Sequence, residues 1–156
     1  MEKHLENPIS EQQISRFIEH QRKSYSAKLN YFLKAIKYSN SLKNKRSTLQ
    51  IKDRFFHDIF PVYDESGKIH WDTLQLFIPH HFEESVMQSY PMFCENEVRL
   101  CCLLIFDVPP KTILNILNYN NLKTIYSTSF TIRQKAGVKE VREIFEKIKI
   151  NQISIL

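Results

Sequence analysis

Glycine is almost absent from this chain of 156 residues, which contains only Gly67 and Gly137. Alternating runs of β-branched residues are also scarce, so the half-buried strands of a sheet are not indicated. No apolar run reaches 18 residues, and the N-terminus lacks the apolar region of a signal peptide. The sequence therefore predicts an all-α protein located in the cytoplasm.

The sequence also lacks recognisable catalytic signatures. It contains no Gly-rich phosphate loop, no Gly-x-Ser-x-Gly elbow and no His-Glu-x-x-His pair. His80 and His81 are adjacent, so on a helix their side chains diverge by about 100° and do not readily share an ion. Cys94, Cys101 and Cys102 cluster on one predicted helix, which suits reduced thiols used in packing. We expect no enzyme activity, no metal site and no cofactor.

The net charge of +5 is unevenly distributed along the chain. Residues 1–60 carry 12 basic and 6 acidic side chains, residues 61–92 carry 1 and 5, and residues 93–156 carry 9 and 6. An acidic middle thus separates two basic blocks. This pattern favours either a polyanionic partner or docking of the middle against the ends, and the sequence leaves both open.

A long amphipathic helix is predicted near the N-terminus, with Ser10 as its N-cap and its end near Ser39. Its apolar positions step by threes and fours, interrupted by Arg22. These positions are Ile14, Ile18, Tyr25, Leu29, Phe32 and Ile36. The spacing is that of a coiled coil, and the last five form a predicted dimerisation seam. The alternative is one amphipathic helix that packs on its own domain.

The chain divides into three predicted regions. Residues 1–62 form a helical arm, with a second helix over 48–60. Residues 63–92 begin with a turn at 64–67 and continue as short connecting helices over 71–78 and 80–89. Residues 93–156 form a C-terminal helical domain.

The C-terminal domain has the spacing of a helix–turn–helix. A helical stripe over 93–104 leads to a break at 107–110, a short helix over 111–117, a polar turn at 118–121 and a helix over 122–136. Gly137 closes that helix, and a last helix is predicted over 138–149. Acidic residues are absent from Val108 to Lys139, a stretch that contains five basic residues. Three short helices with this charge indicate contact with a nucleic-acid phosphate backbone.

Many residues of this domain fall in register with one known pattern. They are Tyr90-Pro91, Glu95, Glu97, Arg99-Leu100-Cys101-Cys102-Leu103, Lys111, Ile113, Ile116-Leu117, Ile125, Ile132-Arg133, Lys135 and Gly137. In these residues the chain resembles the LuxR-type helix–turn–helix at the C-terminus of Bacteroidetes transcriptional regulators. The resemblance covers about the last 65 residues, and the Arg-Leu-Cys-Cys-Leu run is its most specific piece. It implies a DNA-binding regulator whose recognition helix is residues 122–136.

The chain departs from the family pattern at several positions. Ser129 and Thr131 stand where relatives usually carry arginines on the exposed recognition face. Leu114 replaces the small alanine at the helix crossing, and Pro110 replaces the serine that caps the scanning helix. Cys94 stands in for the Ser or Thr of a capping box. These departures are compatible with the fold and weaken base recognition.

The predicted DNA contacts lie on the recognition helix and at the start of the preceding helix. Ile125 and Ile132 are seven residues apart and face the core, which turns a polar face outward. The predicted contacts are Lys111, Lys123, Thr124, Ser127, Thr128, Thr131, Arg133, Gln134 and Lys135. Tyr126 and Phe130 form an aromatic patch that faces either the core or a partner.

Two functional hypotheses follow. The first is a dimeric transcriptional regulator, or a remnant of one, that binds double-stranded DNA through the helix–turn–helix. The second is a helical protein-interaction module that kept the fold and lost specific DNA binding, which Ser129 and Thr131 favour. No small-molecule site and no membrane segment are evident from the sequence.

Overall fold

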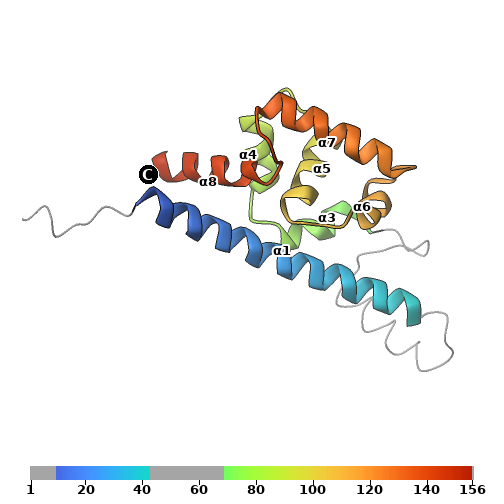
Figure 1. Cartoon of the computed structure of the whole chain (residues 1–156). Helices are drawn as coiled ribbons and strands as arrows, with labels where there is room; N and C mark the ends of the chain where they lie inside the picture. Colours follow the sequence, from blue (N-terminus) through green and yellow to red (C-terminus); the bar gives the residue numbers. More distant parts are fainter. Residues whose placement is uncertain (1–9, 43–68, 156) are drawn as a thin grey trace, which may run out of the picture.

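The computed structural model describes residues 10–42 and 69–155, and the regular structure in this part consists of helices without strands (Figure 1). In chain order they are α1 (Glu11–Leu42), α3 (Trp71–Leu74) continued by the 3-10 helix η2 (Gln75–Phe77), α4 (Phe82–Ser89), α5 (Glu95–Ile105), α6 (Pro110–Leu117), α7 (Leu122–Ala136) and α8 (Glu143–Ile155). The predicted all-α class is confirmed. The predicted helix at 48–60 and turn at 64–67 lie outside the described residues.

The first helix begins where the sequence predicts it. The amide of Gln13 donates to the Ser10 hydroxyl at 3.2 Å, and the amide of Ser10 donates to Gln13 Oε1 at 3.0 Å. This reciprocal pair satisfies amides that have no partner within the helix. The N-cap prediction is therefore confirmed, and α1 runs to Leu42, slightly beyond the predicted end near Ser39.

The apolar stripe of α1 lies in the chain's own core. Four of the predicted seam residues are at most 4% exposed, namely Ile18, Leu29, Phe32 and Ile36. The fifth, Tyr25, is half-buried, with its ring centroid 6.1 Å from that of Phe106. Buried side chains of this kind have no surface left for a second copy. The structure corrects the predicted dimerisation seam, because the stripe packs on its own domain.

The core is built around α5. This helix contacts α4, α6, α7 and α8, while α1 runs along the assembly with α8 beside its N-terminal half (Figure 1). The rings of Phe82, Phe106 and Phe145 meet at the end of α5, with centroids 5.3 to 5.7 Å apart. Burial raises the pKa of the Cys101 and Cys102 thiols. Both cysteines are therefore protonated packing groups at neutral pH, as the sequence predicts.

The end of α7 agrees with the sequence prediction, whereas both ends of α8 differ from it. Gly137 ends α7 as predicted, with φ at +68°, a conformation that glycine adopts without strain. In contrast, α8 begins at Glu143 and not near Val138, and it continues to Ile155 instead of ending near residue 149. The Glu143 carboxylate accepts the amides of Lys139 and Glu140, both at 2.8 Å, and so holds the loop that precedes the later start of α8.

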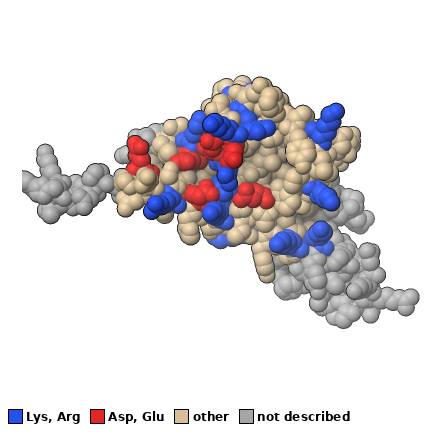
Figure 2. Space-filling view, viewed as in Figure 1, with Lys and Arg blue, Asp and Glu red and all other residues tan. Residues whose placement is uncertain are grey.

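A small charged cleft of about 240 Å³ lies between α1 and the start of α8. Its lining includes the acidic residues Glu19, Glu143 and Glu146 and the basic residues Arg22 and Arg142. Red and blue atoms mingle in the middle of the face that Figure 2 draws. Charges of both signs compensate one another here, so the cleft is a contact between helices and offers no single-sign site.

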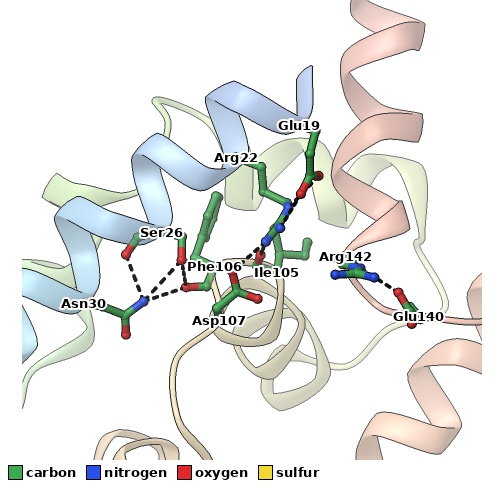
Figure 3. A network of polar contacts seen from close by, with 9 residues as sticks. All are labelled: Glu19, Arg22, Ser26, Asn30, Ile105, Phe106, Asp107, Glu140 and Arg142. Atoms are coloured by element: carbon green, nitrogen blue, oxygen red, sulfur yellow. Dashed lines mark hydrogen bonds and ion pairs between the residues drawn. The ribbon is translucent and has the colours of Figure 1, made fainter. Parts of the chain in front are cut away.

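Polar side chains of α1 cap the C-terminal end of α5 (Figure 3). Arg22, Ser26 and Asn30 are four residues apart, so they lie on one face of α1. Arg22 Nη1 donates to the Ile105 carbonyl at 2.8 Å, and Ser26 Oγ and Asn30 Nδ2 donate to the Phe106 carbonyl at 2.7 and 2.9 Å. Carbonyls near a helix end lack intrahelical donors, and burying them unbonded is costly. The donors on α1 satisfy these two carbonyls, so the cost of burying them unbonded is avoided.

The charge of Arg22 is compensated by two carboxylates. Its side chain is only 3% exposed and lies 2.6 Å from Glu19 Oε1 and 2.8 Å from Asp107 Oδ2. The hydrogen bond from Arg22 lowers the pKa of Glu19, and the same bond raises the pKa of Arg22. Asp107 has a φ of +59°, a left-handed conformation that is uncommon for residues other than glycine. The guanidinium is thus held where α1 meets the end of α5.

Replacing Arg22 should loosen α1 from the rest of the protein. Arg22→Met keeps an unbranched stem and removes the bonds to Ile105 and the two carboxylates. We expect a loss of about 1.5–3 kcal/mol in the free energy of unfolding, because hydrogen bonds to a charged group are lost. The exposed neighbour supplies the control, Lys23→Met, which should change stability by less than about 0.5 kcal/mol. Urea unfolding followed by circular dichroism measures both, and equal stabilities would contradict the capping role.

Candidate nucleic-acid interface

α6 and α7 are consecutive helices whose ends are fixed by local sequence. Pro110 is the first residue of α6, where its missing amide has no helical partner to lose. Asn118 ends α6 in a left-handed conformation, with φ at 59°. Asn121 caps α7, because its Oδ1 accepts the amide of Thr124 at 3.0 Å. The polar turn at 118–121 is therefore present, and α5, α6 and α7 contact one another.

α7 turns its apolar side to the core as the sequence predicts. Ile125 and Ile132 are 1% and 0% exposed. The aromatic patch, for which two orientations remained open, faces outward: Tyr126 is 59% exposed and Phe130 is 53% exposed. The guanidinium carbon of Arg133 lies 5.9 Å from the Phe130 ring centroid, within the range of a cation–π contact. The outer face of α7 is therefore partly aromatic.

The remaining predicted contacts on α7 differ in how freely they reach solvent. Lys123, Ser127 and Gln134 are exposed, whereas Thr124, Thr128, Thr131 and Arg133 are half-buried. Ser127 Oγ donates to the Thr124 carbonyl and Thr131 Oγ1 donates to the Ser127 carbonyl, both at 3.2 Å. A phosphate oxygen is only an acceptor, so each hydroxyl must leave its helical carbonyl before it can bond a phosphate.

Lys135 is held by the protein itself, although the sequence predicts a DNA contact there. Its ammonium lies 2.8 and 3.0 Å from the two carboxylate oxygens of Glu97, and it also donates to the Met92 carbonyl at 3.3 Å. Glu97 is only 6% exposed and also accepts the amide of Cys94 at 2.8 Å. A buried carboxylate needs such a cation, so Lys135 joins α7 to the start of α5 and is not free for a phosphate.

This pair sets a pH dependence of stability. Burial acts to raise the pKa of Glu97, but the Cys94 amide and Lys135 outweigh it, and the pKa lies below its ordinary value of 4.5. The ionised carboxylate therefore stabilises the fold fully above that value, and the contribution is lost as the pH falls through the folded-state pKa.

We expect wild-type stability to decline below about pH 5 and Glu97→Gln to be less stable at pH 7, with a flatter dependence in acid. Urea unfolding between pH 3 and 7, a range that spans the ordinary pKa of Glu97, measures both curves. Glu84→Gln, which changes an exposed carboxylate on α4, is the control. Parallel curves for the wild type and Glu97→Gln would contradict the assignment.

Basic residues from α1 and the α6–α7 segment share one surface. Lys34, Lys37, Lys111 and Tyr126 line a groove of about 670 Å³ between α1, α6 and the start of α7. The three lysines and Lys123 are exposed, and none forms an ion pair with an acidic residue of the described part. On the face that Figure 2 draws, the described residues at this end include blue atoms of Lys and Arg. We call Lys34, Lys37, Lys111 and Lys123 the basic end.

Lys34 and Lys37 are absent from the contacts that the sequence predicts. The sequence predicts the N-terminal arm as a separate region. Only the packing of α1 in the folded protein brings Lys34 and Lys37 beside α6. One signal was available, since no acidic residue occurs between His20 and Leu42. Two acid-free segments, 20–42 and 108–139, thus meet at the groove.

The adjacent histidines are arranged differently from the prediction. His80 and His81 precede α4 and are not within a helix, and the φ of His81 is 60°. Their ring centroids therefore lie 3.6 Å apart instead of diverging. His81 Nδ1 contacts Glu84 Oε2 at 3.2 Å. In the described ranges, no group of three or more His, Cys, Asp or Glu residues is arranged to hold a metal ion.

Searches among protein-family models, curated proteins and solved structures found no match to this chain. Among the described helices, none is both long enough and apolar enough to span a membrane. The function must therefore be inferred from the exposed residues of the molecule itself.

Proposed function

We propose that this protein is a regulator that binds double-stranded DNA through α6, α7 and the C-terminal half of α1. The observation that carries the proposal is the basic end, where exposed lysines from both segments form no ion pair with an acidic residue in the described part of the chain. Such a surface is attracted to a polyanion and releases counterions from it on binding. The resemblance to LuxR-type helix–turn–helix domains favours duplex DNA among polyanions, and a chromosomal target implies a cytoplasmic location.

In this proposal α7 approaches the major groove by its N-terminal half. Lys123 lies in the first turn of α7 and Lys111 in the first turn of α6, so both are placed to contact phosphates. Lys34 and Lys37 add contacts from α1. Gln134, which could form a bidentate contact with adenine, lies in the last turn of α7 and away from its N-terminal half, and no arginine of α7 is fully exposed. We therefore expect binding that depends strongly on salt and weakly on sequence.

A salt titration tests this function. With five phosphate contacts from the basic end and Arg133, the slope of log affinity against log salt should be roughly −4 to −5. Lys34→Ala combined with Lys37→Ala should flatten it by about two units on every duplex. Lys139→Ala combined with Lys147→Ala removes the same charge from exposed positions elsewhere and should leave the slope nearly unchanged. Fluorescence anisotropy with random duplexes supplies the affinities.

Two outcomes would contradict the proposal. The first is no retention of duplex DNA at ~50 mM salt, where electrostatic binding is strongest. The second is an equal change of slope for the two double variants, which would mean that only the net charge matters. Lys135→Ala is a further control, because it should lower stability through Glu97 without changing the slope.

The second candidate function, a protein-interaction module, is favoured by the exposed aromatic residues of α7. Tyr126 and Phe130 lie on successive turns and expose more than half of their surface. Aromatic residues of this kind are common anchors of protein interfaces. Failure of DNA binding in the titration, with the fold intact, would leave this function as the preferred one.

We also propose that the protein acts as a homodimer, since two copies would place two weak basic faces on neighbouring half-sites. The contact must use a surface other than the buried stripe of α1. Phe17 and Tyr31 are 60% and 78% exposed, and they are the large hydrophobic residues that α1 exposes among its described side chains. Phe17→Glu with Tyr31→Glu should give a folded monomer by light scattering and circular dichroism. A wild type that is monomeric at high concentration would rule the dimer out.

A further inference from the structure

The groove at the basic end combines an apolar floor with a cationic rim. Its volume of about 670 Å³ is within the range of small-molecule sites. Leu33, Ile36, Ile69 and Leu122 supply aliphatic surface, and Tyr126 adds an aromatic ring at the side. No acidic residue is among the described residues that line it.

The charged residues in the described lining of the groove are all lysines. Lys34 and Lys37 are three residues apart on α1, so they project from the same side of that helix. Lys111 faces the groove from α6, which begins there at Pro110 and adds the positive end of its helix dipole. Polar Asn115 and Thr112 complete the lining on the α6 side. A ligand that fits has an apolar body and an anionic end.

We propose that this groove binds a single long-chain carboxylate of the fatty-acid class. The hydrocarbon chain lies along the aliphatic floor, and the carboxylate accepts hydrogen bonds from the lysines at the rim. Charge complementarity selects the anion over a neutral lipid, because three lysines line the groove and no acidic residue is among the described residues of its lining. The volume is that of a site for one small molecule.

The direct test is a titration of the full chain with cis-parinarate, a fluorescent fatty-acid anion, below the concentration at which it forms micelles. We expect saturable binding and an affinity about tenfold lower for its methyl ester, which lacks the charge. Replacing Lys34, Lys37 and Lys111 together by alanine should lower the affinity for the acid about tenfold and leave that for the ester unchanged. Replacing the exposed Lys23, Lys139 and Lys147 together by alanine is the matched charge control, because none of them lines the groove.

The apolar part of the site is tested on α7. Tyr126→Glu places a like charge in the groove and should abolish parinarate binding. Phe130→Glu changes an equally exposed aromatic residue, one turn further along, that does not line the groove, and it should bind as the wild type does. Circular dichroism confirms that both variants are folded. Equal loss in both variants, or none in either, would overturn the assignment of the site.

Other occupants would give different results. The absence of saturable binding would overturn the proposal and mean that the groove is filled by this chain's own residues or by another macromolecule. Sedimentation with phosphatidylglycerol vesicles, without binding of monomeric parinarate, would indicate a membrane surface instead of a single ligand. If the proposed DNA binding also holds, bound parinarate should weaken it, because the same lysines serve both; the direct titration does not depend on that second effect.

Discussion

The structure depends on the capping of α5 by α1. The carbonyls of Ile105 and Phe106 end a buried helix, and Arg22, Ser26 and Asn30 supply the donors that they lack. This contact explains why a polar residue interrupts the apolar stripe of α1. It also fixes the register of α1 against the core, because the three donors meet their acceptors in one alignment. The lysines further along α1 are thereby placed beside α6.

Ion pairs at the two ends of α5 also decide which basic side chains remain available to a partner. A buried carboxylate at the start of α5 holds Lys135, and a buried guanidinium at its end holds α1. Glu97 and Lys135 neutralise each other within the fold, so Lys135 is not available to bind a partner. Three of the lysines outside such pairs, Lys34, Lys37 and Lys111, line one apolar groove. In the two proposals, DNA and a fatty-acid anion compete for the basic end of the molecule. Binding of the fatty acid would therefore regulate binding of DNA.

The sequence predicts the parts of this protein that local rules control. Ser10, Asn121 and Gly137 mark helix ends because capping depends on neighbours within a few residues. The two orientations of the α1 stripe could not be separated, since an intrachain core and a dimer seam need the same spacing. The sequence predicts a DNA contact at Lys135 for a similar reason: its partner Glu97 is distant in sequence, and nothing in the local pattern distinguishes a structural cation from a free one. The groove arises only once α1 has docked.

In the proposed function, α1 and the α6–α7 segment form one DNA-binding surface. Hydrogen–deuterium exchange, measured with and without a random duplex at low salt, shows which segments the DNA covers. We expect DNA to slow exchange both in residues 30–37 of α1 and in residues 110–125, and to leave exchange in α8 unchanged. Protection confined to α7, or absent from both segments, would rule out a shared surface.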